Sequence, residues 1–286
     1  MKYAFIRSHR EQFRIVRMCE VLDVSRGGYY EWLGRRPSTH AKHDVRLLAQ
    51  IRHVHDANRQ AYGAVKTWRA LQRQGISCGK HRVARLRRVH GIEALRKRRF
   101  RVSVEHHHTA RASPNLLQQH FSVAEPDRVW VGDMTFIRTR AGFLYLAVLL
   151  DLYARRVVGW SMSHRPDVPL VLGALAMALQ RRPARGLIHH TDQGGVYGAR
   201  PYRTLMQTHG LQPSMSAKGS AYDNAVAESF FSNVKNEMVH HCDFATREHA
   251  RAAIFEYIEC FYNRARLHQT LNYRTPIEVE QQWRRA

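Results

Sequence analysis

The feature that most limits the fold of this chain is a change in the spacing of its apolar residues near residue 128. Before this point apolar side chains recur every three or four residues, which is typical of amphipathic helices. After it come three short apolar runs separated by short turns, "RVWVGDMTFIRT", "AGFLYLAVLLDLY" and "RRVVGWSMS". We expect these runs to be consecutive strands of one sheet.

Helical and strand patterns alternate in the next part of the chain. Helices are expected over 167–182, with Asp167 as N-cap, and over 198–209, and strands in "GLIHHTDQ" and "LQPSMS". A further helix is expected within "GSAYDNAVAESFFSNVKNE", residues 219–237. Three meandering strands followed by this alternation predict an α/β domain with a mixed sheet.

The region before residue 100 is predicted to be all α-helical. Residues 10–33 have the outline of a helix-turn-helix, with a turn at Asp23 and Ser25 as the N-cap of the second helix. A helix over 44–58 is followed by "YGAVKTWRALQRQGISCGKHRVARLRRVHGI", which predicts two more helices, the second capped by Ser77. This is a clearer second helix-turn-helix unit.

Positive charge is concentrated in this helical region. The chain has 46 Lys and Arg against 23 Asp and Glu, a net charge of +23, of which the first 112 residues carry +18. A partner with many negative charges is expected, and nucleic acid is the commonest one. A ribosome-associated or simply basic protein is the alternative that composition leaves open.

Arginines crowd the outer surface of the last predicted helix in this region, whose inner side is formed by Val83, Leu86 and His90. Such like charges repel one another unless an anion lies beside them, so we expect them to contact DNA, although a solvated basic face would look the same. The tail "RKRRFR" extends the charge. The expected DNA-binding residues here are Arg82, Arg85, Arg87, Arg88, Lys97, Arg98 and Arg99.

Composition also limits the compartment. No run of eighteen apolar residues is present, and the start "MKYAFIRSHREQF" has no apolar signal segment. The four cysteines are scattered and include no C-x-x-C pair, which favours free thiols in a reducing compartment. We therefore expect a cytoplasmic protein without a membrane partner, associated with the nucleoid when it is bound to DNA.

Three acids occupy positions where carboxylates are unexpected. Asp133 interrupts the first predicted strand, Asp192 ends the fourth just before a glycine pair, and Glu228 lies early in the helix among small and apolar residues. Separately they have ordinary explanations, namely a bulge, a turn residue and a solvated helix position. If strands one and four are neighbours and the helix packs across them, all three carboxylates meet at one edge of the sheet.

Three clustered carboxylates would repel one another strongly without a counter-charge. Divalent cations supply that charge, and oxygen ligands suit Mg²⁺, with Mn²⁺ as a substitute. Two such ions about 4 Å apart can stabilise the attacking and the leaving oxygens of a phosphodiester. The acids thus predict a site with two metal ions for phosphoryl transfer.

The sequence resembles the DDE-class transposases of bacterial insertion sequences, in the group related to retroviral integrases. The resemblance is carried by "WVGDMTFI", "HHTDQGGVYG" and "GSAYDNAVAESFFSNVKNE", with 35 residues between Asp192 and Glu228. Further matches are "VSRGGYYEW", "YGAVKTWRALQRQGI", "SPNLLQQHF" and "YNRARLHQTLNYRTPIEV", so it covers essentially the whole chain. It implies that Lys235, seven residues after Glu228, lies near the DNA phosphates.

The resemblance also implies the fold class and the domain organisation. An α/β ribonuclease H-like core is expected, preceded by all-α helix-turn-helix units and followed by a helical extension. The expected segments are 1–40 and 41–100 for the two helix-turn-helix units, 101–124 for a linker that contains "HHH", 125–240 for the catalytic core and 241–286 for the extension. The integrase zinc module needs a close cysteine pair, so no structural zinc is expected.

The activity implied is metal-dependent 3′-end cleavage and strand transfer, with Asp133, Asp192 and Glu228 as catalytic metal ligands. Its partners would be the terminal repeats of the element, target DNA, other copies of the chain and a companion protein or fusion segment from an upstream reading frame. Two alternatives remain: a nuclease that cuts without joining, and a catalytically inactive DNA-binding regulator of transposition.

Other residues near these motifs have simpler expected roles. Asp151 suits a hairpin turn, and Asp223 and Asn224 suit helix capping. His190 either orients Asp192 or packs in the core. Tyr197 and Tyr222 could stack on unpaired bases, although packing is the simpler expectation.

Overall fold

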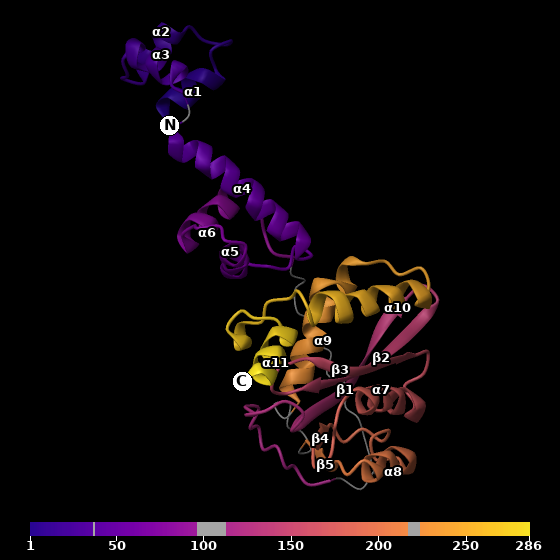
Figure 1. Cartoon of the computed structure of the whole chain (residues 1–286). Helices are drawn as coiled ribbons and strands as arrows, with labels where there is room; N and C mark the ends of the chain where they lie inside the picture. The colour runs from indigo at the N-terminus through magenta and orange to yellow at the C-terminus, as the bar shows by residue number, and fades with distance from the viewer. Residues whose placement is uncertain (37, 96–112, 217–223) are drawn as a thin grey trace. The chain divides into compact units, whose positions relative to one another are not determined.

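The computed structural model describes all of the 286 residues except 37, 96–112 and 217–223 (Figure 1). It divides into two compact units, Met1–Gln50 and Ile51–Ala286, with the boundary inside helix α4 (Thr39–Ala57). Lys97, Arg98, Arg99, Asp223, Tyr222 and the histidines of the expected linker lie outside the described residues. Among the described helices, none has the length and apolarity that crossing a bilayer requires.

The first unit contains three short helices, α1 (Lys2–Ser8), α2 (Ile15–Val21) and α3 (Arg26–Gly34). They pack around a small core that includes Ile6, Met18 and Tyr29. The predicted turn is present, because Asp23 adopts a left-handed φ of 48° between α2 and α3. Ser25 caps α3 as expected, since its hydroxyl accepts a hydrogen bond from the Gly28 backbone N–H at 2.8 Å.

The second unit begins with the end of α4, α5 (Ala64–Arg73) and α6 (Lys80–Val89). Helices α5 and α6 form the predicted pair and share a core of Leu71, Val83 and Leu86. The predicted cap of α6 was wrong: the N-cap is Gly79, not Ser77. The chain stays extended for two residues longer than expected, and the indole of Trp68 donates to the Cys78 carbonyl in that stretch at 2.9 Å.

Five strands form the mixed sheet that the apolar runs predict: β1 (Val129–Thr139), β2 (Gly142–Asp151), β3 (Val157–Ser163), β4 (Ile188–Thr191) and β5 (Gln212–Met215). Their spatial order is β3-β2-β1-β4-β5. The first three strands pair antiparallel as a meander, while β4 pairs parallel with both β1 and β5. The long strand β1 is therefore central and forms the boundary between the antiparallel and the parallel halves.

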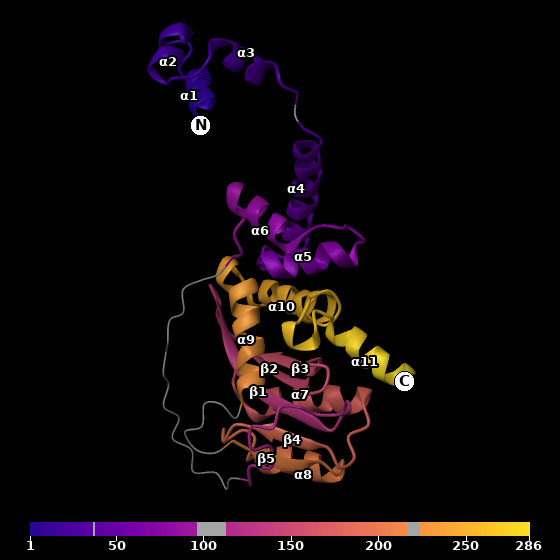
Figure 2. The same ribbon diagram turned by 90° about the vertical axis from the view of Figure 1, so that its left-hand side faces the viewer.

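Helices cover both faces of this sheet, as Figures 1 and 2 show. On one face α7 (Val168–Arg181) and α8 (Arg200–Thr208) bury residues such as Leu175 and Met206 against Trp130. On the other, α9 (Ala225–Glu237) and α10 (Arg247–Phe255) bury Phe230 and Ile254. The strand residues therefore alternate between two cores, which explains the nearly continuous apolar character of β2.

The C-terminal part continues with a 3₁₀ turn at Val239–His241 before α10, a π-helix at Glu256–Tyr262 after it, a 3₁₀ turn at Gln269–Leu271 and helix α11 (Pro276–Arg285). Helix α11 begins with a capping box: Thr275 accepts from the Glu278 backbone, and the Glu278 side chain accepts from the Thr275 backbone at 2.8 Å.

A buried carboxylate of α11 forms ion pairs with the α/β core. Glu280 is 2% exposed and accepts hydrogen bonds from Arg182 and Arg156, the latter at 2.8 Å. The Arg182 guanidinium also donates to Asp127 at 2.9 Å, and Arg284 closes the network at 2.7 Å from Glu280. Because each buried charge has an opposite partner, the desolvation of the group is compensated within the network.

Candidate active site

Asp133 lies in the middle of β1, opposite Val148 of β2, and is partly buried. A strand interior is an unfavourable place for aspartate, but here one side of β1 is open, since its pairing with β4 ends at Val131↔His190. The carboxylate accepts a hydrogen bond from the Met134 backbone N–H at 2.7 Å. The aspartate thus follows the last β1–β4 pair by two residues, at the carboxyl end of β4.

The register of the parallel pair brings Asp192 level with Asp133. Strand β4 ends at Thr191, and the last paired positions are Val131 and His190. Two more steps along each chain reach Asp133 and Asp192, whose side chains share one face because strand side chains alternate. The sheet itself therefore brings the two aspartates together.

A tight turn fixes the carboxylate of Asp192. The Gly194 backbone N–H donates to its Oδ1 at 2.9 Å. A Cβ atom at residue 194 would lie 2.8 Å from the same oxygen, closer than real contacts allow. A side chain at residue 194 would therefore have to displace the Asp192 carboxylate.

Glu228 is on the first turn of α9 and is exposed. The opposite side of this helix is apolar: Ala227, Phe230 and Phe231 are buried in the core cluster that includes Val131 of β1. The helix therefore packs across β1, as the sequence prediction required. Glu228 lies in its first turn, on the exposed side.

The electrostatics show that these three acids lie near one another. Burial, together with the neighbouring carboxylates of Asp192 and Glu228, raises the pKa of Asp133 to about 8 against the opposing effects of the Met134 N–H and Lys235. Burial also raises the pKa of Glu228.

The acids are not assembled into a finished metal site. Within the described ranges, no three His, Cys, Asp or Glu side chains are close enough together to hold one ion. The donor set nevertheless suits Mg²⁺ or Mn²⁺, which prefer carboxylate oxygens. A divalent cation would also compensate the charge of a carboxylate that burial and two acidic neighbours destabilise.

Lys235 lies on the same side of α9 as Glu228, two turns along. Its ammonium group is 5.4 Å from the centre of the Phe136 ring of β1. Partial burial lowers the pKa of Lys235, and the charge of Asp133 opposes that shift. The lysine is thus close enough to Asp133 for the two charges to interact.

Several neighbouring residues have structural roles. Asp151 is fully buried and accepts from the Asp127 and Ala154 backbone N–H groups at 2.9 Å, which is the turn role expected of it. Asn224 occupies the N-cap position of α9, but its side chain makes no capping hydrogen bond. His190 packs between strands: it shares hydrogen bonds with Ser214 at 2.8 Å and Ser216 at 3.3 Å.

Tyr197 also packs rather than stacking on a base. It is 3% exposed, and its ring meets the ring of Tyr202 edge-on at 5.5 Å between centres. Its hydroxyl has no hydrogen-bond partner in the described structure.

The arginines of α6 do not form one surface. Arg85 and Arg88 are exposed and Arg82 is partly exposed, so these three remain candidates for DNA contact. The expectation for Arg87 was wrong. Its side chain is 4% exposed, and its guanidinium donates to the Thr67 hydroxyl at 3.0 Å and to the Tyr62 carbonyl at 2.9 Å. It stabilises the packing of α6 on α5, while His90, expected to face inward, is exposed.

Sequence comparison places these observations in a known family. The family described as "Integrase core domain" matches residues 123–221, and a second family with the same description matches 228–283. An "HTH-like domain" matches residues 42–100. A relative of Escherichia coli (strain K12), "Transposase InsF for insertion sequence IS3A", is 41% identical over 283 residues, which are 98% of each chain. The chain belongs to the insertion-sequence transposases with an integrase core domain.

Another member of this family is similarly related. The "Insertion element IS600 uncharacterized 31 kDa protein" of Shigella sonnei is 41% identical over 267 residues, 93% of this chain and 98% of the relative. Among solved structures, the HTLV-2 integrase catalytic core domain in complex with magnesium (dimeric form) is 15% identical with a TM-score of 0.42, covering 55% of this chain and 98% of that one. The ribonuclease H-like fold class expected from the sequence is confirmed by the family and by the mixed sheet.

Several polar residues that line a cavity in the structure were not identified from the sequence. Amide side chains at Asn233, Asn236 and Gln269 line a cavity together with Lys66. The available signal was the presence of two asparagines on a polar side of the helix that carries Glu228. Gln269 and Lys66 gave no signal, because only the tertiary structure brings them close to that helix.

Proposed function

We infer that this chain is a DDE polynucleotidyl transferase that cleaves the 3′ ends of an insertion sequence and joins them to target DNA. We assign Asp133, Asp192 and Glu228 as its catalytic carboxylates and metal ligands. The reaction would take place on bacterial nucleoid DNA.

One observation carries the assignment of the acids. The parallel register of β1 and β4 makes Asp133 and Asp192 level, and the packing of α9 adds Glu228 near enough to raise the pKa of Asp133. Carboxylates gathered in this way are costly for a protein that only binds DNA. In a phosphoryl-transfer site these carboxylates would bind the catalytic metal ions.

These residues fit Mg²⁺ or Mn²⁺ as cofactors. Two such ions, when bound by carboxylates, polarise a phosphodiester and lower the pKa of an attacking hydroxyl group. The contribution of the chain is to fix the donors: the sheet holds both aspartates, and the Gly194 N–H orients Asp192. Lys235 would bind a non-bridging phosphate oxygen beside them, since its ammonium group is close to Asp133.

DNA binding away from the acids is assigned to the helix-turn-helix unit. The exposed arginines Arg82, Arg85 and Arg88 of α6 would contact phosphates of the element end, and Lys97, Arg98 and Arg99 follow in the sequence. Integration of two ends requires at least two active sites, so we propose that several copies assemble on the DNA. A partner or fusion segment from an upstream frame would add to this assembly.

The test uses the purified full chain, a duplex with the element's own terminal repeat, supercoiled target DNA and Mg²⁺. Wild type should nick the 3′ end and give joined products, whereas Asp133→Asn, Asp192→Asn and Glu228→Gln should bind the duplex normally and give neither. Strand transfer by any of these three variants near the wild-type rate would refute the assignment.

The same assay separates the alternatives. A nuclease would cut the terminal repeat but give no joined product at any target concentration. An inactive regulator would bind the repeat with strong salt dependence and cut nothing in Mg²⁺ or Mn²⁺.

A further inference from the structure

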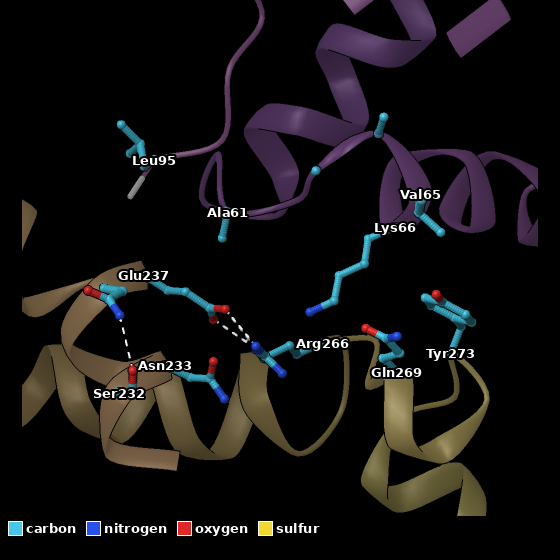
Figure 3. A pocket seen from close by; sticks show the side chains of 13 residues that line it. Ala61, Val65, Lys66, Leu95, Ser232, Asn233, Glu237, Arg266, Gln269 and Tyr273 are labelled. Atoms are coloured by element: carbon cyan, nitrogen blue, oxygen red, sulfur yellow. Dashed lines mark hydrogen bonds and ion pairs between the residues drawn. The ribbon is translucent and has the colours of Figure 1, made fainter. Parts of the chain in front are cut away.

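A cavity of about 600 Å³ lies beside α9 (Figure 3). Four parts of the chain, all within the second unit, form its walls. They are residues 61–66 at the start of α5, Leu95, residues 232–237 of α9, and residues 266–273 of the C-terminal part. The cavity therefore connects the HTH-like domain with the catalytic helix.

Polar and apolar groups contribute about equally to its lining. Asn233, Asn236 and Gln269 present amides, which can both donate and accept hydrogen bonds, and the Lys66 side chain extends between the walls in Figure 3. The Lys66 ammonium group is 5.4 Å from the centre of the Tyr62 ring. Amides beside a cation are groups that recognise nucleotide bases and phosphates.

A buried ion pair forms the floor and is already neutral. Arg266 donates to Glu237 at 2.6 Å, and the Tyr257 hydroxyl donates to the same carboxylate at 2.8 Å. Arg266 and Glu237 neutralise each other, and Lys66 brings a further ammonium group to the cavity. The start of α5 adds partial positive charge, since its N-cap, Gly63, has no side-chain oxygen to cap the first N–H groups.

The walls are held together without a ligand. The Tyr62 hydroxyl, on a side chain 1% exposed, accepts a hydrogen bond from the Leu267 backbone N–H at 2.7 Å. Arg73 forms an ion pair with Glu278 of α11. Arg59 pairs with Glu256 of the π-helix and lies over two aromatic rings there. The cavity is thus preformed, which lowers the entropy cost of binding.

The distance along α9 from Glu228 to the asparagines of the cavity shows how far the cavity lies from the acids. Asn233 and Asn236 are five and eight residues after Glu228, which is about 8 and 12 Å along the helix axis. They lie about 140° and 80° around the helix from Glu228, on a neighbouring face. At about 3.4 Å of DNA axis per nucleotide, this separation corresponds to about two to four nucleotides of one strand.

We propose that this cavity binds one nucleotide of the element's terminal DNA, unstacked from the duplex, about two to four nucleotides from the scissile bond. The amides would contact the edge of the base, and Lys66 with the start of α5 would bind the adjoining phosphate. The nucleotide belongs to the element side of the cut, because the opposite wall is part of the domain that we assign to end binding. This proposal rests on the proposed function.

The size of the cavity favours a single nucleotide over other forms of DNA. Its volume is in the range of sites for small organic ligands, so a duplex cannot enter. A base reaches such a site only by leaving the stack, as in enzymes that flip their target base. The alternative occupant is a polar segment from a second copy of the chain, and the experiment below distinguishes it.

The experiment uses the full chain, Ca²⁺ in place of Mg²⁺ to prevent cleavage, and duplexes with the element's own end. Each duplex carries 2-aminopurine at one of the six terminal positions, because its fluorescence rises when it unstacks. Wild type should raise the fluorescence several-fold only at about two to four nucleotides from the cut. Asn236→Ala and Gln269→Ala should lose this rise and slow cleavage in Mg²⁺ by about tenfold.

Gln207→Ala is the matched control, since it removes an exposed amide from α8, which contributes no residue to the cavity. It should behave as wild type. Lys66→Met should keep the position of the fluorescence rise but lower the salt dependence of end binding by about one phosphate contact. Circular dichroism and thermal melting of each variant verify that it is folded.

Each outcome decides between the possibilities. Bound duplex without a fluorescence rise at any position overturns the proposal. Loss of self-association in Asn236→Ala and Gln269→Ala with an unchanged fluorescence pattern assigns the cavity to a second copy instead. Failure of wild type to cleave in Mg²⁺ would refute the proposed function, whereas the fluorescence measured in Ca²⁺ tests the cavity separately.

Discussion

The sheet and helix α9 contribute to the acid site in different ways. Asp133 and Asp192 are positioned by backbone pairing, since their strands are neighbours in parallel register, and a glycine N–H fixes one of them. Glu228 is positioned only by the packing of its helix and is exposed. The difference indicates a preformed half that holds two carboxylates and a second half whose donor completes the site.

The largest expected effect is the loss of strand transfer when one of the three acids is replaced. Metal binding should then distinguish the two aspartates from Glu228. Asp133→Asn and Asp192→Asn should each lower strand transfer at least about 1,000-fold and abolish the thermal stabilisation that Mn²⁺ gives the wild type. Glu228→Gln should lower the rate similarly but keep part of that stabilisation, because the aspartate pair is intact. Equal loss of Mn²⁺ stabilisation in all three variants would contradict the distinction between the halves.

A smaller effect is expected from the turn that orients Asp192. Gly194→Ala introduces a Cβ at 2.8 Å from Oδ1 and should displace the carboxylate. Strand transfer should fall about 10- to 100-fold, as when outer-shell partners of metal ligands are lost. The measurement is the Mn²⁺ concentration for half-maximal activity, which should rise. Gly186→Ala, at a turn where φ is +74° and no atom lies near the added methyl group, destabilises the fold by backbone strain alone and so controls for general destabilisation.

Replacing Lys235 of α9 should lower the cleavage rate less than replacing one of the three acids. Lys235→Met removes the charge beside Asp133 and should lower cleavage about tenfold, while Lys235→Arg should keep most of the activity. Single-turnover kinetics with pre-bound DNA measure the effect. An unchanged rate in Lys235→Met would show that the phosphate is bound elsewhere.

The smallest effect is on stability and depends on pH. The pKa of Asp133 is raised to about 8, far above that of an unfolded aspartate near 4, so its ionisation destabilises the folded state as pH rises from 4 to 8. Asp133→Asn should therefore melt a few degrees higher than wild type at pH 8.5 in EDTA. The difference should vanish near pH 4. A constant difference across this range would place the Asp133 pKa elsewhere.

Much of this fold could be predicted from the sequence, because the deciding signals are local. The apolar runs gave the three-stranded meander, and Ser25 and Asp167 gave helix starts, each of which makes its capping hydrogen bond. The two aspartates were recognisable since aspartate is unfavourable within or at the end of a buried strand. That these aspartates lie close to a glutamate on a helix could be predicted only on the condition that β1 and β4 are neighbours.

The rest depends on contacts that the local pattern does not contain. Arg87 has the same local surroundings as Arg85 and Arg88, and only the approach of Thr67 and the Tyr62 carbonyl decides that it is buried. The cavity beside α9 is formed by four parts of the chain up to about 200 residues apart, so no sequence window includes it. The cap at Gly79 instead of Ser77 follows from the tertiary contact of Trp68.

The position of Glu280 has a consequence for damaged copies of the gene. A stop codon before α11 would remove the carboxylate that neutralises Arg156 and Arg182, and would leave the buried Arg182 with Asp127 as its remaining partner and Arg156 without its ion pair to Glu280. Such a shortened product should misfold and be degraded by cellular proteases. It would then not compete with the full-length protein for the ends of intact elements in the same cell.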